Sequence, residues 1–318
     1  MKIYILGGEL INPGDLSWDC FNKYGDVVVI NDVDMCKLPE IIADADVLVG
    51  VPDEPFGKKE LKYAKKLGYI GLFSAGYDHV DLEFCSKRGI IVCNNPGYGS
   101  NMVSQYAISL LLEICCNISK MNEVVHLNKW NQRAEYVLKY PEIELFEKTM
   151  GIIGFGRIGR VTGRIAQAFG MNVLYNDVAP VPEEENDKCR FSSLDNLLQS
   201  SDVVVLHCPL FPETENIINA KTLAKMKDGV ILINNARGAL VDEKALYDAL
   251  CSGKVMAAGL DVTRDEPIKA DNPLLTCSNC IITPHFSWLA KETRSRIISN
   301  ALHGLEQYLE GSPVHRVN

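Results

Sequence analysis

The sequence of 318 residues has no long hydrophobic run. Near the N-terminus, the apolar stretch that follows Lys2 is far shorter than the core of a signal peptide. No later stretch approaches the ~18 apolar residues of a membrane-spanning helix. Low-complexity segments are also missing, and the composition of 47% hydrophobic and 23% charged residues is typical of globular proteins. We therefore expect a folded cytoplasmic protein that has no membrane partner.

An excess of positive charge is also missing, because the formal net charge is −9. A surface of this charge repels nucleic acid and anionic membranes, so neither is an expected partner. The negative surface also weakly repels anionic small molecules. An anionic substrate would therefore need a local positive site on this protein.

The eleven cysteines are scattered, and most lie in apolar runs, as buried thiols do. We expect no structural disulfides. One C-x-x-C pair, Cys277 and Cys280, has the spacing of zinc sites and redox dithiols, but there is no second pair to complete four zinc ligands. Redox pairs of this spacing normally open a helix, whereas this pair precedes the apolar segment Ile281–Ile282. The sequence therefore predicts no metal site and assigns this pair no function.

Two series of short apolar runs alternate with helical stretches, which favours two α/β domains built on parallel sheets. The expected strands of the first series are Lys2–Leu6, Asp26–Ile30, Asp46–Val49, Tyr69–Phe73 and Gly89–Val92. Those of the second are Thr149–Ile153, Asn172–Tyr175, Asp202–Leu206, Gly229–Ile233, Val255–Ala258 and Cys280–Ile282. The expected helices include Lys58–Lys66, Leu82–Lys87, one unbroken helix from about Ser100 to Leu127, and Leu289–Leu309.

A G-x-G-x-x-G motif, made by Gly154, Gly156 and Gly159, follows an apolar strand and opens a helix. The first glycine permits a tight turn, the second lets backbone approach a pyrophosphate, and the third lets helix pack closely on strand. The helix start at Arg157 and Ile158 then supplies free N–H groups for the phosphates. A glycine-rich turn without a ligand is the alternative.

Asp177 ends the next strand, about 20 residues after the glycines, where an acidic residue meets the ribose 2′-hydroxyl of a dinucleotide. Its carboxylate would repel the 2′-phosphate of NADP. We therefore predict NAD as the cofactor, with NADP as the alternative.

Three chemically distinct side chains follow successive strands of the second series: Arg237, Glu266 and His285. Strand ends of open α/β sheets are where ligands bind. An arginine holds a carboxylate with a bidentate fork, and a carboxylate paired to a histidine raises the pKa of the ring and makes it a proton donor. Each residue alone is more often structural, but together they suit the reduction of a 2-oxo acid.

These segments, in this order, resemble the D-isomer-specific 2-hydroxyacid dehydrogenase family over essentially the whole chain. The matching motifs are Asn235-Ala236-Arg237-Gly238, Asp261-Val262 with Glu266-Pro267, and Thr283-Pro284-His285 with Trp288. The resemblance implies that Arg237 and His285 bind substrate, that His285 is the acid/base, and that Glu266 orients and charges it. It also implies a Rossmann cofactor domain, residues 100–286, inserted into a flavodoxin-like substrate domain of residues 1–99 and 287–318.

The same resemblance implies roles for residues that the chemistry alone does not single out. The loop that contains Ser74, Ala75 and Gly76 is expected to present backbone N–H groups to the substrate carboxylate. Asp261 is expected near the nicotinamide carboxamide, and Ala236 is also expected to bind the cofactor. The cofactor's adenine side is expected to be lined by His207, Pro209 and Thr214. A homodimer is also implied.

Within the family, the segment from Asn94 to Gln105 and the later Trp130 look closest to the glycerate dehydrogenase, or hydroxypyruvate reductase, branch. Hydroxypyruvate and D-glycerate are therefore the expected substrate pair. Another 2-oxo acid reductase, of the glyoxylate, phosphoglycerate or D-lactate type, is the alternative. Glu266 argues against a formate dehydrogenase, because formate dehydrogenases have Gln in that role. An NAD(H)-sensing corepressor-like binding protein is a further alternative of another class.

Overall fold

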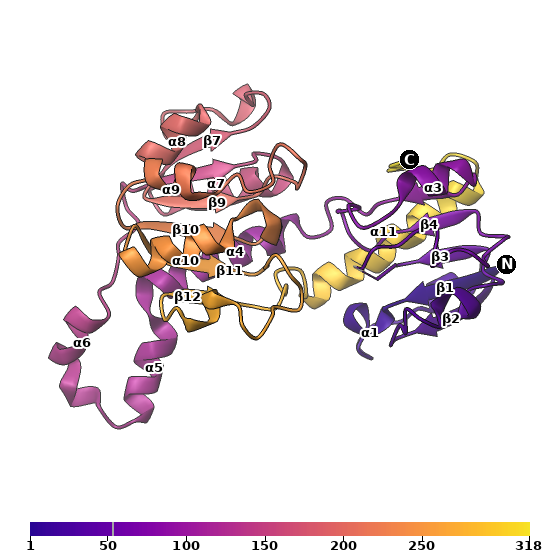
Figure 1. Cartoon of the computed structure of the whole chain (residues 1–318), viewed down its shortest axis with the longest axis horizontal. Helices are drawn as coiled ribbons and strands as arrows, with labels where there is room; N and C mark the ends of the chain where they lie inside the picture. The colour runs from indigo at the N-terminus through magenta and orange to yellow at the C-terminus, as the bar shows by residue number, and fades with distance from the viewer. Residues whose placement is uncertain (53) are drawn as a thin grey trace. The chain divides into compact units, whose positions relative to one another are not determined.

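The computed structural model describes residues 1–52 and 54–318. The chain divides into two compact units (Figure 1). Unit 1 consists of Met1–Gly99 and Trp288–Asn318, and unit 2 consists of Ser100–Ser287. Each unit is built around one parallel sheet, and the predicted α/β class with two parallel-sheet domains is confirmed.

Unit 1 contains a five-stranded parallel sheet in the order β2-β1-β3-β4-β5, which is the flavodoxin-like order. Its strands are β1 (Lys2–Leu6), β2 (Asp26–Ile30), β3 (Val47–Val49), β4 (Tyr69–Gly71) and β5 (Ile91–Cys93). Its helices are α1 (Gly8–Ile11), α2 (Leu38–Ile41), α3 (Leu82–Lys87) and α11 (Lys291–Leu309), with the 3-10 turn η1 (Asp19–Phe21).

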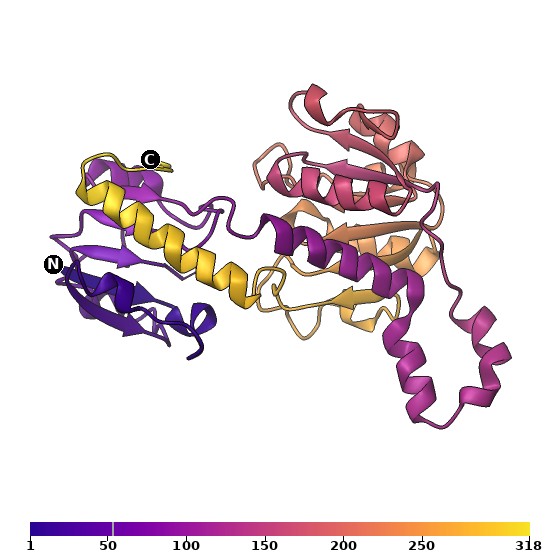
Figure 2. The same cartoon turned by 180° about the vertical axis from the view of Figure 1, so that it is seen from behind.

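Alternate residues of β1 face opposite layers of unit 1, as the two-residue period of a strand requires. Ile3 and Ile5 pack in one apolar cluster with Ile297 and Leu305 of α11. Tyr4 and Leu6 pack in another, whose members come from α2, α3 and the sheet. The long C-terminal helix α11 therefore covers one face of this sheet, and Figure 2 shows it lying along the strands.

Unit 2 contains a seven-stranded parallel sheet in the order β12-β11-β10-β9-β6-β7-β8. The first strand of this unit, β6, lies inside the sheet, third from one edge, and the strand order reverses there, which is the Rossmann arrangement. Its strands are β6 (Thr149–Ile153), β7 (Asn172–Asn176), β8 (Cys189–Phe191), β9 (Val203–Leu206), β10 (Val230–Asn234), β11 (Val255–Leu260) and β12 (Cys280–Ile282). The short strand β8 was not predicted.

Helices cover both faces of the unit 2 sheet, so its central strands are apolar throughout. On β10, Ile231 and Ile233 pack with α4 and α7, whereas Leu232 packs with α8, α9 and α10; Figures 1 and 2 show these two layers. The helices are α4 (Ser100–Cys116), α5 (Ile118–His126), α6 (Arg133–Lys139), α7 (Arg157–Ala168), α8 (Leu194–Ser200), α9 (Ala220–Lys225) and α10 (Glu243–Ser252). The 3-10 turns are η2 (Trp130–Gln132), η3 (Pro182–Glu184), η4 (Gly238–Leu240) and η5 (Pro273–Thr276).

The prediction of one unbroken helix from Ser100 to Leu127 was wrong. Asn117 adopts a left-handed conformation, with φ of 49°, and separates α4 from α5, which are bent by 53°. Asparagine is one of the few residues that tolerates this conformation. Buried residues of α4 pack on the sheet, whereas α5 and α6 bury no residue and project from the sheet of unit 2 (Figure 1).

The predicted helix Lys58–Lys66 was also wrong, because this segment forms consecutive turns. The guanidinium of Arg88 donates to the carbonyl oxygens of Leu61 and Ala64, at 2.8 and 2.6 Å. In an α-helix, each of these two carbonyl oxygens would instead accept a hydrogen bond from the backbone N–H group four residues later. Hydrogen bonds from the distant Arg88, which the sequence does not reveal, therefore replace the backbone hydrogen bonds of a helix in this segment.

Of the described helices, no single one is long and apolar enough to span a membrane. The bent pair α4 and α5 passes that test together, by length and composition only.

Candidate active site

The glycine turn between β6 and α7 has the shape that a pyrophosphate requires. Gly154 has φ of 92°, and a Cβ atom there would lie 2.3 Å from the backbone nitrogen of Cys208. A Cβ atom on Gly159 would lie 2.3 Å from the Gly154 oxygen. By contrast, a Cβ atom on Gly156 would meet no described atom within 4 Å. The turn is thus packed against protein at two glycines and open at the middle one.

Helix α7 begins at Arg157 and Ile158 with Gly156 as its N-cap, and no side chain caps it. Its first N–H groups therefore stay available to an anion at the helix N-terminus. Since the open glycine lies beside these groups, the turn fits a dinucleotide.

Asp177 follows β7 and lies against the glycine turn. One carboxylate oxygen accepts from the Phe155 N–H at 2.6 Å, and the other accepts from the Val178 N–H at 2.7 Å. The carboxylate is thus fixed beside the turn, where an acidic group meets the ribose of a dinucleotide.

His207, Pro209 and Thr214 lie on the loop that follows β9. Burial lowers the pKa of His207 to about 3, so its ring is neutral. Its Nε2 lies 2.8 Å from the Thr162 hydroxyl, while its buried Nδ1 has no hydrogen-bond partner among the described residues. The Thr214 hydroxyl donates to the Pro209 carbonyl oxygen at 2.7 Å. The His207 ring thus contacts α7 through Thr162, and the Thr214 side chain bonds within its own loop. Contacts of His207, Pro209 and Thr214 with an adenine remain a prediction.

Arg237 lies on a tight turn between β10 and η4 and is half-buried. The Asn234 side chain shapes this turn, because it donates to the Arg237 carbonyl oxygen at 2.9 Å and accepts from the Ala236 N–H at 3.1 Å. Gly238 then allows close packing, since a Cβ atom there would lie 2.0 Å from the Thr263 backbone. The turn that carries Arg237 is therefore pressed against the loop that carries Glu266.

Glu266 and His285 form a hydrogen-bonded ion pair. The His285 Nδ1 lies 2.8 Å from Oε2 of Glu266, and Oε1 of Glu266 accepts from the Thr263 N–H at 3.2 Å. The two side chains are 34% and 40% exposed, so solvent reaches the pair. Because Nδ1 faces the carboxylate, Nε2 is the nitrogen that is positioned to exchange a proton with a substrate.

The charges of this pair shift both pKa values away from the ordinary ones. Burial by itself lowers the pKa of His285, but the hydrogen bond and the charge of Glu266 outweigh it and leave the pKa raised. Burial likewise favours a higher pKa for Glu266, but its bond to His285 holds the pKa below the ordinary value. The charge of Arg237 acts on both groups and lowers both pKa values, so the three side chains form one cluster.

Asp261 is almost fully buried, with 1% of its surface exposed, and it fixes the turn that carries His285. Its carboxylate accepts from the Thr283 hydroxyl at 2.6 Å and from the N–H groups of Phe286 and Ser287 at 2.9 and 2.8 Å. These bonds surround His285, whose φ of 60° is rare for a residue other than glycine. Asp261 is thus a positioning residue, and a contact to the nicotinamide stays a prediction.

Sequence reasoning missed the positioning roles of Asn234 and Thr283. Both stand beside predicted catalytic residues, and neither has a spacing that distinguishes it from an ordinary polar residue at the end of a strand. The only sign of them in the sequence is their residue type, because short polar side chains often bond to nearby backbone.

The predicted substrate loop Ser74–Gly76 lies in unit 1, after β4. The Ser74 hydroxyl donates to the Gly76 carbonyl oxygen at 2.6 Å. The Asn94 side chain donates to the Ala75 carbonyl oxygen at 2.7 Å, and the Asn95 N–H donates to that of Ser74 at 2.9 Å. Several carbonyl oxygens of the loop are thus occupied by protein donors. Its contact with a substrate stays a prediction.

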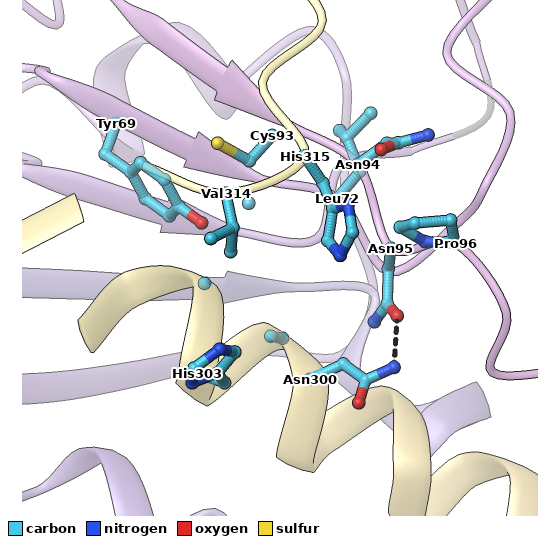
Figure 3. A pocket seen from close by; sticks show the side chains of 13 residues that line it. Tyr69, Leu72, Cys93, Asn94, Asn95, Pro96, Asn300, His303, Val314 and His315 are labelled. Carbon is cyan, nitrogen blue, oxygen red and sulfur yellow. Dashed lines mark hydrogen bonds between the residues drawn. The ribbon is translucent and has the colours of Figure 1, made fainter. Parts of the chain in front are cut away.

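Unit 1 also holds a cavity of about 230 Å³ between α11, the end of β5 and the C-terminal segment (Figure 3). Its polar lining includes Asn94, Asn95, Asn300, His303 and His315. Asn300 donates to the buried Asn95 side chain at 2.9 Å, which is the bond drawn in Figure 3. None of the three predicted catalytic residues lines this cavity, because all three belong to unit 2.

Known proteins resemble this chain over its whole length. Residues 108–287 match the family described as D-isomer specific 2-hydroxyacid dehydrogenase, NAD binding domain. A hydroxypyruvate reductase of Blautia hydrogenotrophica is 49% identical over 100% of both chains. A glyoxylate reductase of Korarchaeum cryptofilum is 36% identical over 88% of this chain and 84% of its own.

A solved structure shares the fold as well. The D-lactate dehydrogenase of Aquifex aeolicus, complexed with NAD and lactic acid, superimposes with a TM-score of 0.85 at 28% identity over 98% of this chain and 96% of its own. The Rossmann strand order of unit 2 agrees with these matches. The chain belongs to the D-isomer specific 2-hydroxyacid dehydrogenase family, and unit 2 contains its NAD-binding domain.

Proposed function

We propose that this enzyme reduces hydroxypyruvate to D-glycerate with NADH and catalyses the reverse reaction with NAD. The observation that carries the proposal is the 2.8 Å bond between Glu266 and His285, with the charge of Arg237 acting on both. The substrate is supported by the hydroxypyruvate reductase that is 49% identical over the full length. We also propose Arg237, Glu266 and His285 as its catalytic residues.

The three side chains would divide the chemistry between them. Arg237 would bind the substrate carboxylate through its guanidinium fork and polarise the adjacent carbonyl group. His285 would give its Nε2 proton to the carbonyl oxygen during reduction and take it back during oxidation. Glu266 would hold the ring orientation and stabilise the imidazolium. The nicotinamide cofactor, when bound, supplies or accepts the hydride at C2.

The cofactor would be held by unit 2. We assign the pyrophosphate to the backbone at Gly154, Gly156 and Gly159 and the N–H groups at Arg157 and Ile158, and the ribose hydroxyls to Asp177. Both oxygens of Asp177 are fixed by backbone donors, so the carboxylate would remain close to any 2′-phosphate and disfavour NADPH. Unit 1 would then be the substrate domain, with the N–H groups of Ala75 and Gly76 facing the substrate carboxylate.

A panel of short 2-oxo acids, assayed with NADH and with NADPH, tests this function. We expect hydroxypyruvate to give the highest kcat/KM, glyoxylate and pyruvate to follow, and NADH to outperform NADPH with each substrate. Side-chain selectivity in such a pocket rests on ~1–3 kcal/mol per methylene, so the ranking has to be measured. Oxidation of NADH by none of these acids would contradict the proposal.

Replacement of Glu266 by glutamine should change the pH dependence of reduction. Reduction needs protonated His285, so its rate falls as pH rises through the pKa of that ring. Glutamine keeps a hydrogen-bond acceptor but removes the negative charge that raises this pKa. The fall should therefore move to lower pH, and turnover at neutral pH should drop by roughly 10- to 100-fold, a part of the ~10²–10⁴ that acid-base catalysis contributes.

The matched control for this variant is Glu266→Asp, which keeps the charge on a shorter side chain. Its turnover should fall through poorer geometry, but its pH profile should stay closer to that of the parent enzyme. If Glu266→Gln titrates at the same pH as the parent, the carboxylate does not set the pKa of the acid.

A homodimer is the proposed assembly, with α5, η2 and α6 as the contact region. These elements project from unit 2 and carry exposed apolar side chains, including Trp130 (60% exposed), Val137 (67%) and Leu138 (90%). A second copy is the proposed occupant, because the resemblance to the family implies a dimer and the burial of such side chains drives association. The cytoplasmic location remains a prediction from the sequence.

Light scattering from the purified enzyme should give twice the mass of one chain. The double variant Val137→Glu and Leu138→Glu should shift the mass to that of a monomer, whereas Leu10→Glu, at an exposed apolar residue of unit 1, should leave the dimer intact. A parent enzyme with the mass of a monomer would rule out this assembly.

A further inference from the structure

The start of α4, residues 100–104, is hydrogen-bonded to two other segments of unit 2. One is the start of α7, to which we assign the cofactor pyrophosphate, and the other is the end of β10, which Arg237 follows. Helices α4 and α7 lie side by side on one face of the unit 2 sheet (Figure 2). Ala107 and Leu111 of α4 pack in one apolar cluster with Ile152 of β6 and Ile233 of β10.

Ser104 connects the start of α4 to α7. The residue is fully buried, and its hydroxyl donates to the carbonyl oxygen of Ile158 at 3.0 Å and to that of Ser100 at 2.8 Å, as a bifurcated hydrogen bond. The N–H group of Ile158 is one of those that we assign to the pyrophosphate. Ser104 therefore contacts a residue of the proposed cofactor site from the side of α4.

Asn235 connects the start of α4 to the end of β10. The residue is 4% exposed, and its Nδ2 donates to the carbonyl oxygen of Val103 at 2.8 Å. Arg237 follows two residues later on the turn that the Asn234 side chain shapes. Because Val103 and Ser104 are adjacent in sequence, α4 is bonded at successive residues to the two segments that would hold cofactor and substrate.

Neither of these long-range bonds is needed to form the helix. In an α-helix, the carbonyl oxygen of Val103 has a partner in the N–H group four residues later. A serine in a helix can bond back to its own helix alone, as Ser109 does to the carbonyl oxygen of Gln105 at 2.9 Å. The bonds from Ser104 and Asn235 therefore add connections that the helix itself does not require.

We propose that Ser104 and Asn235 are positioning residues, which hold the cofactor turn and the Arg237 turn at a fixed spacing through the start of α4. The inference rests on the proposed function, in which the cofactor binds at α7 while Arg237 holds the substrate carboxylate. A misplacement of about 1 Å between reacting groups costs ~10²-fold in rate. Two buried bonds that fix this spacing thus support turnover without contact with the substrate.

The two bonds act in series, because the start of α4 joins α7 to the end of β10. Loss of either bond should release the same connection, so loss of the second should add little. Side chains that stabilise the fold independently of each other would instead have effects that add. A variant that lacks both bonds therefore distinguishes a positioning role from a merely structural one.

Ser104→Ala and Asn235→Leu are the variants that remove these bonds. Alanine removes one hydroxyl group. Leucine has a shape similar to that of asparagine and removes the Nδ2 donor. The buried Oδ1 of Asn235 has no hydrogen-bond partner among the described residues, so its loss breaks no second bond in this part of the chain. A melting curve checks that each variant is folded, and Ser104→Ala decides alone if Asn235→Leu is not.

The test measures the Kd of NADH by fluorescence, with the full-length enzyme and without substrate, and then kcat with hydroxypyruvate. We expect each single variant to raise the Kd by roughly 3- to 10-fold, as for the loss of one hydrogen bond. We expect kcat to fall by roughly 10-fold, a part of the loss that misplaced reacting groups cause. The double variant should match the more affected single variant in both quantities.

Ser109→Ala and Asn279→Leu are the matched controls. Ser109 bonds only back along α4 in the described structure. Asn279 donates to the carbonyl oxygens of Leu250 and Met256 at 3.4 and 3.0 Å, just before the start of β12, whereas Asn235 follows the end of β10. Both control variants should bind NADH and turn over as the parent enzyme does.

Three results would overturn the inference: an unchanged Kd in Ser104→Ala, effects that add in the double variant, or equal losses in the controls. A parent enzyme that binds no NADH would contradict the proposed function itself, and the inference with it.

Discussion

Replacement of His285 by alanine lowers kcat for hydroxypyruvate with NADH by roughly 10²–10⁴, the contribution expected of a general acid. The expectation rests on the geometry of the ring, whose Nδ1 is bound to Glu266 at 2.8 Å so that Nε2 serves the substrate. The loss should fall mainly on kcat, because Arg237 still binds the carboxylate. Steady-state rates of NADH oxidation, followed by absorbance, measure it.

An exposed histidine of α11 provides the matched control, since His303→Ala removes an imidazole from unit 1 without touching the proposed catalytic cluster. That variant should turn over within a small factor of the parent. Near-normal turnover of His285→Ala would remove this residue from the mechanism.

Replacement of Arg237 by lysine lowers kcat/KM by roughly 10²–10³, the loss that follows removal of a donor aimed at the reacting oxygen. Lysine keeps the positive charge but loses the planar fork that holds a carboxylate through two parallel bonds. The turn itself should survive, because Asn234 holds the backbone of residue 237 and not its side chain. Both the KM for hydroxypyruvate and kcat should change, while NADH binding, followed by fluorescence, should not.

Arg264→Lys is the matched control for Arg237→Lys. Arg264 lies on the neighbouring loop and pairs with the exposed Glu215 at 3.1 Å, so its substitution alters a surface ion pair, which is worth ~0–1 kcal/mol. Equal losses of kcat/KM in both variants would mean that Arg237 has no particular role toward the substrate.

The sequence was sufficient to predict an element where the periodicity of its apolar residues and the residue types at its end indicate the same structure. Strands of unit 2 could be placed because their apolar runs end in distinctive residues, and the parallel order then brings those ends to one edge of the sheet. The pairing of Glu266 with His285 was expected from their residue types, from their positions after successive strands and from the family resemblance, and the structure places their atoms within hydrogen-bonding distance. The glycine turn was predictable because only glycine suits the conformation at Gly154.

The sequence was insufficient where a distant residue decides the outcome. Arg88 takes the carbonyl oxygens that a helix over Lys58–Lys66 would use, and the left-handed Asn117 divides an otherwise periodic helix. Nothing in the spacing distinguishes the positioning role of Asp261 from a cofactor contact.

The most direct test of the central claim is to follow an isotope from cofactor to product. With NADH that carries deuterium at C4 of the nicotinamide, on the face that transfers, and hydroxypyruvate as substrate, the account predicts D-glycerate with one deuterium at C2, seen by proton magnetic resonance and chiral chromatography. Formation of L-glycerate, or of product whose C2 hydrogen comes from solvent, would contradict it.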